Sequence, residues 1–285
     1  MELTDYFQSP PADRVFYHYT SVDTLINVIS HGTLRAGHAA YMNDSMELKH
    51  ALKVLEETLL PLTVFGEMHA LDVRFYMELI EWVGIIIDTS HPCFIFSLSE
   101  EASLLSQWRS YTKAGKGVSI GFNADRLEKI ASLNEFVLAR CLYDEEAQKV
   151  LMHKLATHLY DTFDASGAQP TKETRFTHFE KSQRDIFLTL ALIKHKAFSE
   201  EKEWRLIAYN HHKPEAIGYR EGPFMLVPYV EIDLKKIGPG PQLFDYVILG
   251  PTQHRELALS AANGYLKAKG FCPFVTATEI PFRHW

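Results

Sequence analysis

The sequence predicts an α+β fold: a mixed or antiparallel β core into which long helices are inserted. Short runs rich in β-branched and aromatic residues recur along the chain, and two long segments with helical periodicity, about 45–90 and 145–196, lie between them. After residue 203 the chain is dominated by strand-like runs. No long linker divides it, so we expect an N-terminal arm over residues 1–14 and one α+β domain over 15–285.

Composition limits the possible functions. The 285 residues are 46% hydrophobic, enough for a sizeable core, and the net charge of −7 lacks the basic excess of a general nucleic-acid binder. The N-terminus has no basic stretch followed by an apolar run, and the most apolar segment, 79–87, is too short to cross a bilayer. Three widely spaced cysteines suit a reducing compartment. We therefore expect a cytoplasmic protein without membrane contact.

The N-terminal region is predicted to form a strand that leads directly into a helix. Residues 15–20 are β-branched and aromatic, and apolar residues with helical spacing follow from residue 22. Ser21 or Thr20 is a good N-cap for this helix, and Gly32 is a good residue to end it. His18 therefore lies near a junction where backbone N–H groups and the positive end of a helix dipole can face a ligand.

The rest of the chain is assigned by the same signals. Asn43 and Asp44 have turn and cap chemistry. The predicted helices are 48–61, ending at Pro61, then 67–87, 101–112, 145–164, 172–196 and 255–269. The other predicted strands are 34–36, 93–99, 118–122, 136–143, 203–209, 215–219, 224–230, 246–249, 274–276 and 280–283.

The stretch that begins at Glu203 is the strongest candidate for a functional strand. Trp204 and the alternate residues after it are apolar, whereas Glu203 and Arg205 lie on the opposite face, which is typical of a half-buried strand. Glu201 is expected to project from the same face as Glu203. These charges are either an ordinary solvent-facing ion pair or an anchor for a ligand, and spacing alone leaves both open.

Sequence motifs narrow the chemistry further. The chain contains no P-loop, HExxH, GxSxG or GxGxxG pattern, which disfavours the common motif-bearing hydrolases and Rossmann enzymes. Asp44, Glu47 and Glu203 together have the oxygen ligands of a divalent-cation site, if the fold brings them together. A metal-dependent nuclease or phosphohydrolase is therefore one alternative.

Several short motifs lie along nearly the whole chain. They are Tyr17-His18-Tyr19-Thr20-Ser21, Gly32-Thr33-Leu34-Arg35, Asn43-Asp44-Ser45-Met46-Glu47, Phe96-Ser97-Leu98-Ser99, Trp108-Arg109-Ser110-Tyr111, Gly117-Val118-Ser119-Ile120-Gly121-Phe122, Glu201-Lys202-Glu203-Trp204-Arg205, Ile248-Leu249-Gly250-Pro251 and Ile280-Pro281-Phe282-Arg283. In this order they resemble the motifs of the bacterial family of unknown function DUF2971. The family name implies no activity.

The early His-Tyr-Thr strand and the late glutamate strand also resemble the ADP-ribosyltransferase superfamily. The resemblance implies that His18 holds the adenosine ribose of NAD and that Glu203 binds the nicotinamide ribose and stabilises an oxocarbenium-like transition state. It leaves the aromatic residue that stacks on nicotinamide open between Tyr41 and Trp108. Arg35 can neutralise the NAD phosphates, because a guanidinium forks well onto phosphate oxygens. The other residues expected around the ligand are Tyr19, Thr20, Asn43, Asp44, Glu47 and Arg205.

We therefore expect an ADP-ribosyltransferase-like core that uses NAD as substrate and needs no metal. It would transfer ADP-ribose to a protein or nucleic acid, or hydrolyse NAD, and by analogy act as a toxin or phage-defence effector. A second alternative, beside the metal enzyme, is a ligand-binding or interaction module that keeps the pocket without turnover.

Overall fold

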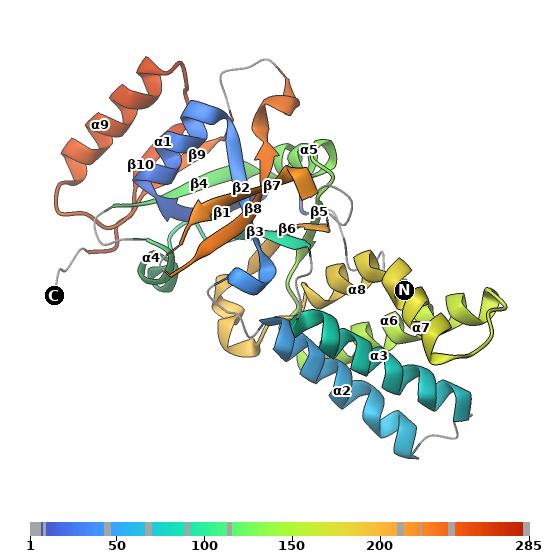
Figure 1. Cartoon of the computed structure of the whole chain (residues 1–285). Coiled ribbons are helices and arrows are strands. Elements are labelled where there is room, and N and C mark those ends of the chain that lie inside the picture. Colours follow the sequence, from blue (N-terminus) through green and yellow to red (C-terminus); the bar gives the residue numbers. More distant parts are fainter. Residues whose placement is uncertain are drawn as a thin grey trace.

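The computed structural model describes residues 7, 10–42, 47–65, 70–88, 92–112, 116–209, 214–222, 224–238 and 243–281. The chain is α+β, with a sheet at one end of the molecule and a group of helices at the other (Figure 1). None of the described helices is long and apolar enough to cross a membrane. Most of the predicted N-terminal arm lies outside the described residues, although Phe7 packs against the core of the helical group.

The strands form one mixed sheet. Its main path runs β10-β9-β4-β1-β3-β2-β8-β7, and β6 and β5 extend it from β3. Only the β9–β10 pair is parallel among the described strand pairs. The strands are β1 (Val15–Ser21), β2 (Thr33–His38), β3 (Cys93–Ser99), β4 (Gly117–Asn123), β5 (Val137–Arg140), β6 (Glu203–Tyr209), β7 (Ile217–Glu221), β8 (Leu226–Asp233), β9 (Tyr246–Leu249) and β10 (Phe274–Ala277).

Strand β3 is the point at which the sheet forks. Along one edge it pairs with β6 over its whole length, from Cys93 to Ser99. Along the other edge its first half pairs with β2, at Phe94 and Ile95, and its last residue pairs with Tyr17 of β1. Strands β1 and β2 therefore separate on this side of β3, and the edge between their contacts opens into a cavity.

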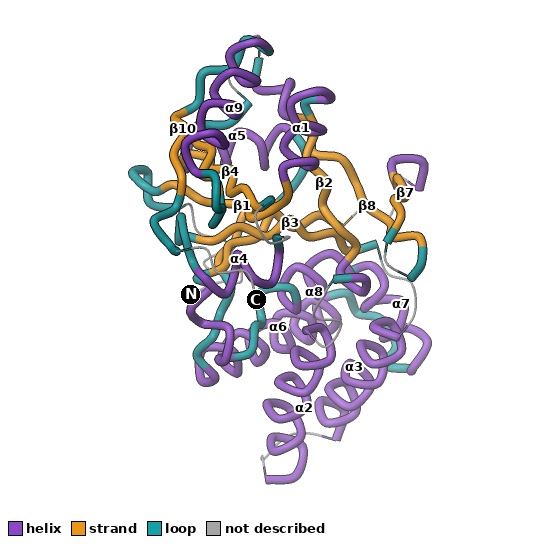
Figure 2. Tube along the Cα trace, turned by 90° about the vertical axis from the view of Figure 1, so that its left-hand side faces the viewer, coloured by secondary structure: helices purple, strands orange, loops and turns teal. Residues whose placement is uncertain are grey.

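Helices cover both faces of the sheet around two hydrophobic cores. Helices α1, α5 and α9 pack on one face, and α2, α3, α6, α7 and α8 form the helical group on the other (Figures 1 and 2). The helices are α1 (Val22–His31), α2 (Glu47–Phe65), α3 (Ala70–Asp88), α4 (Leu105–Tyr111), α5 (Ala124–Leu133), α6 (Glu145–Ala165), α7 (Lys172–Lys181), α8 (Gln183–Leu190) and α9 (Arg255–Ala268). Short 3₁₀ helices include η2 (Ala39–Tyr41) and η3 (Lys196–Glu201).

Most predicted elements are confirmed within a few residues. Strand β1 runs straight into α1, where the Ser21 side chain accepts a hydrogen bond from the Thr24 backbone N–H and Gly32 ends the helix at a φ of 70°. The proline that was expected to end the first long helix, Pro61, instead lies inside α2. Continuing the helix places Leu62 against the core of the helical group, which helps to offset the hydrogen bond that the proline removes.

The predicted helix over 172–196 is wrong. The chain forms α7 and α8, leaves the helix at Ala191, and makes a bridge between Ile193 and Leu142 before η3. Backbone groups after α8 find partners outside a helix: the Lys194 N–H donates to the Leu142 carbonyl at 3.1 Å, and Gln148 Nε2 donates to the Lys194 carbonyl at 2.8 Å. This departure from the helix brings Lys194 under β6.

Three smaller expectations also differ. Helix α4 begins at Leu105 rather than at 101, helix α5 was not predicted, and the described part of 280–283 is not a strand. The half-buried strand predicted at 203–209 is buried on both faces. Trp204 and Leu206 enter the core under α1 and α5, whereas Ile207 and the charged residues face the helical group, because α8 covers that side.

Candidate functional site

Two adjoining cavities occupy the fork of the sheet. One, of about 220 Å³, lies where β1 and β2 separate, and its walls include Tyr17, Tyr19, Tyr41, Ser97, Gln107, Glu201 and Glu203. The other, of about 540 Å³, lies beside the start of α1, and its walls include Thr20, Ser21, Thr24, Asn27, His31 and Thr33. They share five lining residues, which are His18, Arg35, Phe96, Tyr111 and Arg220. Because they share these residues, we treat the two cavities as one cleft, which we call the fork cleft.

His18 stands on the shared wall in a defined protonation state. Its ring stacks on Phe96 with centroids 4.1 Å apart, and its Nδ1 lies 2.9 Å from the Ser97 carbonyl oxygen. A carbonyl can only accept, so Nδ1 carries the proton and Nε2 is left as an acceptor. Burial lowers the pKa of His18 to about 4, with the Ser97 hydrogen bond opposing this in part. The imidazole is therefore neutral at pH 7 and suited to accept a hydrogen bond from a ligand hydroxyl.

A buried cluster of charges lies at the end of the fork cleft near β6; we call it the carboxylate cluster. Arg205 donates from Nε to Glu203 Oε1 at 2.8 Å and from Nη2 to Glu47 Oε2 at 2.6 Å. Lys194 Nζ lies 2.5 Å from Glu203 Oε2, 2.6 Å from Glu201 Oε2 and 3.3 Å from Glu47 Oε1. Three carboxylates thus share two cations.

The pKa values of two carboxylates in this cluster, Glu203 and Glu201, are shifted in opposite directions. Burial raises the pKa of Glu203, but Arg205 and Lys194 outweigh it and hold that pKa at about 2. Burial also raises the pKa of Glu201, which Lys194 only partly opposes, so its pKa stays above the usual value. Paired carboxylates whose environments separate their pKa values are suited to different roles in one reaction.

Two aromatic side chains also line the smaller cavity. They are Tyr41, which is 45% exposed, and Tyr111, which is 41% exposed. Trp108, the other predicted stacking residue, is buried and does not line either cavity. It packs edge-on against Tyr19, with centroids 4.7 Å apart, and its Nε1 donates to Ser103 Oγ at 3.1 Å. Trp108 therefore supports the wall behind Tyr19.

Tyr19 and Thr20 reach the cleft from β1, but the Tyr19 hydroxyl already donates one hydrogen bond and accepts another. Its hydroxyl donates to the Glu101 carbonyl at 2.6 Å and accepts from the Leu104 N–H at 2.9 Å. Tyr19 thereby fixes the backbone of residues 101–104, which lead into α4. Thr20 lines the larger cavity, next to the N-cap of α1.

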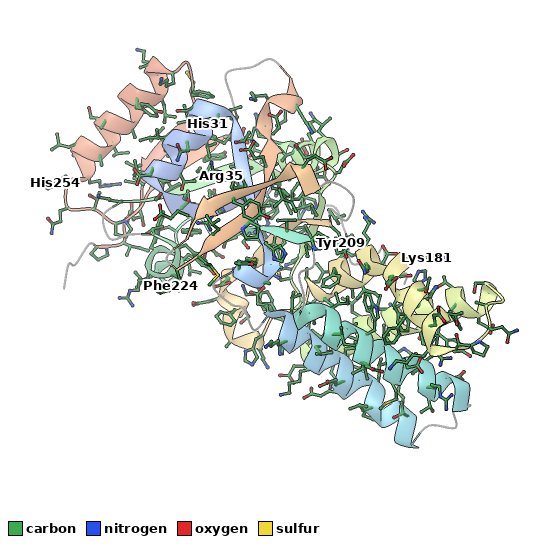
Figure 3. All side chains as sticks on the ribbon, in the orientation of Figure 1. His31, Arg35, Lys181, Tyr209, Phe224 and His254 are labelled. Atoms are coloured by element: carbon green, nitrogen blue, oxygen red, sulfur yellow. The ribbon has the colours of Figure 1, made fainter. Side chains whose placement is uncertain are left out.

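The remaining predicted site residues divide into two groups. Arg35 lies on the sheet at the wall shared by both cavities (Figure 3), and Glu47, at the start of α2, belongs to the carboxylate cluster. Asn43 and Asp44 lie outside the described residues. The structure thus brings together His18, Arg35, Tyr41, Glu47, Glu203 and Arg205 around one cleft or directly behind it.

The metal alternative finds little support in the described part of the chain. Glu47 and Glu203 do meet, but their oxygens face Lys194 and Arg205. No group of three or more His, Cys, Asp or Glu residues among those described is placed to hold a metal ion.

Sequence reasoning did not select three residues of the cleft and its cluster, which are Lys194, Tyr111 and Arg220. Lys194 was expected inside a helix, Tyr111 stood only at the end of a family motif, and Arg220 belonged to no motif. Glu201 was expected on the same face as Glu203; it lies in η3 rather than on the strand, although it joins the same cluster. The one usable signal was the Glu-x-Glu-x-Arg spacing of 201–205, which marks the cluster without revealing its cations.

The fold is α+β, and its forked sheet holds a cleft lined by a neutral histidine, arginines and paired carboxylates. Residues 107–206 match the family model described as "Protein of unknown function (DUF2971)". The match runs from α4 to β6, about a third of the chain, and it supports the resemblance to the DUF2971 family that the motifs indicated. Comparison with curated proteins and with solved structures gave no match.

Proposed function

We propose that the fork cleft binds NAD and cleaves its nicotinamide–ribose bond, so that ADP-ribose passes to a macromolecule or to water. The observation that carries this proposal is that His18 and Glu203, from distant parts of the sequence, line the same cavity. The proposal includes an ADP-ribosyltransferase-like type for the sheet and its fork.

The charge distribution of the cleft supports an NAD-like ligand. Arg35 and Arg220 lie on the wall shared by the two cavities, whereas Glu201 and Glu203 line the smaller one alone. NAD has the complementary pattern, with an anionic diphosphate in the middle and a positively charged nicotinamide ring at one end. Tyr41 and Tyr111 offer rings on which a flat heterocycle can stack.

The proposed reaction uses the carboxylates in different ways. When the bond between C1′ and the nicotinamide nitrogen breaks, neutral nicotinamide leaves with the electron pair and positive charge develops on the ribose. Glu203, held ionised by Arg205 and Lys194, stabilises that charge. The acceptor oxygen or nitrogen then bonds to C1′ and loses a proton, and Glu201, with its raised pKa, is the nearby carboxylate suited to take it.

The test combines binding with turnover. NAD should raise the thermal midpoint of the protein, because a ligand that binds only the folded state stabilises it. His18→Ala should abolish this shift, and His153→Ala, on the exposed face of α6, should leave it unchanged. Release of nicotinamide from NAD, followed by chromatography, should accompany binding. Absence of both the shift and nicotinamide release at saturating NAD would overturn the proposal.

A ligand-binding module without turnover is the second candidate, and one observation favours it. Both Glu203 oxygens are already engaged by Arg205 and Lys194, an arrangement that can stabilise the fold with no ligand present. Glu203→Gln separates the two candidates. A binding module has no nicotinamide release to lose, whereas the enzyme loses release while NAD still raises the thermal midpoint.

A further inference from the structure

Arg35 rests on a platform built from the β7–β8 hairpin. Gly218 of β7 pairs with Tyr229 of β8, and a Cβ atom at residue 218 would lie 2.7 Å from Tyr229 Cζ. Glycine at this position therefore lets the tyrosine ring lie across the neighbouring strand. The Arg35 guanidinium carbon lies 4.5 Å from the centroid of that ring, within cation–π distance.

The Arg35 guanidinium does not pair with the nearest carboxylate in register. Glu231 stands directly opposite Arg35 across the β2–β8 pair, yet no ion pair joins them. Glu231 lines a separate cavity of about 400 Å³ that Arg35 does not line. Within the part of the chain that the structure describes, the stacking on Tyr229 is the contact that holds Arg35, and its N–H groups remain available to the fork cleft.

Arg220 reaches the same place from β7. It pairs with Val227, two residues along from the Gly218–Tyr229 pair, so its side chain shares the face that carries the Tyr229 ring. Arg220 is exposed, lines both cavities, and has no ion pair with any described residue. In a chain with 36 acidic and 29 basic residues, two arginines of this kind on one shared wall form a local excess of positive charge.

We infer that Arg35 and Arg220 together hold a diphosphate group where the two cavities join. Each guanidinium can donate two parallel hydrogen bonds to phosphate oxygens, and the stacked Arg35 loses little side-chain freedom on binding. The larger cavity offers Ser21, Thr24 and Asn27 to a hydroxyl-rich group on one side of the diphosphate. That the ligand is a dinucleotide rests on the proposed function; recognition of the diphosphate does not.

The experiment measures binding by calorimetry with three probes: inorganic pyrophosphate, ADP-ribose, and nicotinamide riboside, which has no phosphate. The wild type should bind pyrophosphate and ADP-ribose. Arg35→Ala and Arg220→Ala should each weaken ADP-ribose binding by about 10-fold or more, the usual effect of losing hydrogen bonds to a charged group, and leave nicotinamide riboside unchanged. Arg184→Ala, an arginine with 61% exposure on α8, is the matched control and should change nothing.

Gly218→Ala tests whether Arg35 is positioned by the platform. The added methyl group displaces the Tyr229 ring, so ADP-ribose binding should fall while nicotinamide riboside binding stays constant. Equal loss for both probes, or no loss in Arg220→Ala, would overturn the inference even if NAD is cleaved. Conversely, pyrophosphate binding that depends on both arginines would sustain it even if NAD is neither bound nor cleaved.

Discussion

Two buried arginines, one in each half of the molecule, show how differently the same charge can be used. In the helical group, Arg175 is 2% exposed and makes two hydrogen bonds to Glu78, at 2.6 and 2.9 Å, and one to the Pro170 carbonyl at 2.7 Å. At the fork of the sheet, Arg205 is 1% exposed and bonds two carboxylates and the Ala191 carbonyl. The Arg175 pair is balanced, with one acid for one base.

The carboxylate cluster around Arg205 is not balanced, since three carboxylates share two cations and two of the carboxylates line a cavity. A balanced, enclosed pair can be explained by stability alone. An excess carboxylate beside a cavity raises the free energy of the empty protein unless something positive can enter. The comparison therefore separates a structural ion pair from a candidate binding site by charge count and access rather than by burial.

The largest expected effect is on the free energy of unfolding. If Arg175 and Arg205 variants respond alike to a second substitution, the distinction between the two arginines is wrong. Arg175→Met and Arg205→Met should each lower the free energy of unfolding by about 3–5 kcal/mol, because each leaves a buried carboxylate without its partner. Adding Glu78→Leu to Arg175→Met should recover most of that loss. Adding Glu203→Leu to Arg205→Met should recover less, because two carboxylates, Glu47 and Glu201, are then left to share Lys194 alone. Denaturant unfolding measures all four variants, and equal recovery would contradict our distinction.

The second effect concerns turnover. If the proposed function holds, Glu203→Gln should lower the rate of nicotinamide release by about 10²–10³-fold, the size usual for losing one preorganised electrostatic contact to a transition state. Glu78→Gln, which disturbs the balanced pair, should leave the rate of the folded protein unchanged. A similar fall in both variants would mean that the loss comes from the fold rather than from the cleft.

The third effect is a pH dependence of stability. His18 has a pKa of about 4 in the folded protein and of about 6.5 when unfolded, so the unfolded chain binds the extra proton between these values. Stability should therefore fall by about 2 kcal/mol, allowing for partial exposure, as the pH drops from 6.5 to 4, and should gain nothing from this residue above 6.5. His18→Gln should make the thermal midpoint depend less on pH over this range.

His178 of the helical group is the matched histidine for this measurement. Burial lowers its pKa too, although the Leu159 carbonyl opposes this. His178→Gln should also make the thermal midpoint depend less on pH, but it should leave the affinity for NAD unchanged. Glu203 adds a separate step at lower pH: its depressed pKa contributes stability above about 4.5 that is lost as the pH falls towards about 2.

The smallest effect compares two buried serine hydroxyls. Ser97 Oγ and Ser119 Oγ both lack a hydrogen-bond partner among the described residues, but only Ser97 lines the fork cleft. Replacing either by alanine should change stability by about 1 kcal/mol or less, because no hydrogen bond is lost. Only Ser97→Ala should weaken NAD binding, if the ligand uses that hydroxyl. Calorimetry on both variants checks this, and equal affinities would remove Ser97 from the site.

Local signals in the sequence were enough to predict most of the elements. The cap at Ser21 and the glycine at 32 located α1, and alternation located β6, because these features depend on neighbours in the chain. The break between α8 and η3 was not predictable in this way. Nothing between 182 and 196 is a proline or glycine, and the groups that stabilise the break come from Leu142, Gln148 and Arg205.

The candidate site was predictable only as separate pieces. His18 and Glu203 were chosen one by one, and their meeting depends on β3, which pairs with both β1 and β6. Burial of both faces of β6 was missed because the cover comes from α8, and α8 can pack on β6 only because the chain leaves the helix after Leu190. Lys194 could not be assigned to the carboxylate cluster without knowing that α8 ends at Leu190. The ratio of carboxylates to cations in the cluster was therefore not predictable either.

The fork at β3 has a consequence for the order in which the molecule can assemble. Residues 93–99 must wait for residues 203–209, and residues 33–37 must wait for 229–233, before either edge of the fork is closed. Such distant pairings close long loops and fold slowly. The cleft walls therefore form late, from segments made far apart in time on the ribosome, and a nascent chain that stops before β6 lacks the strand that carries Glu203.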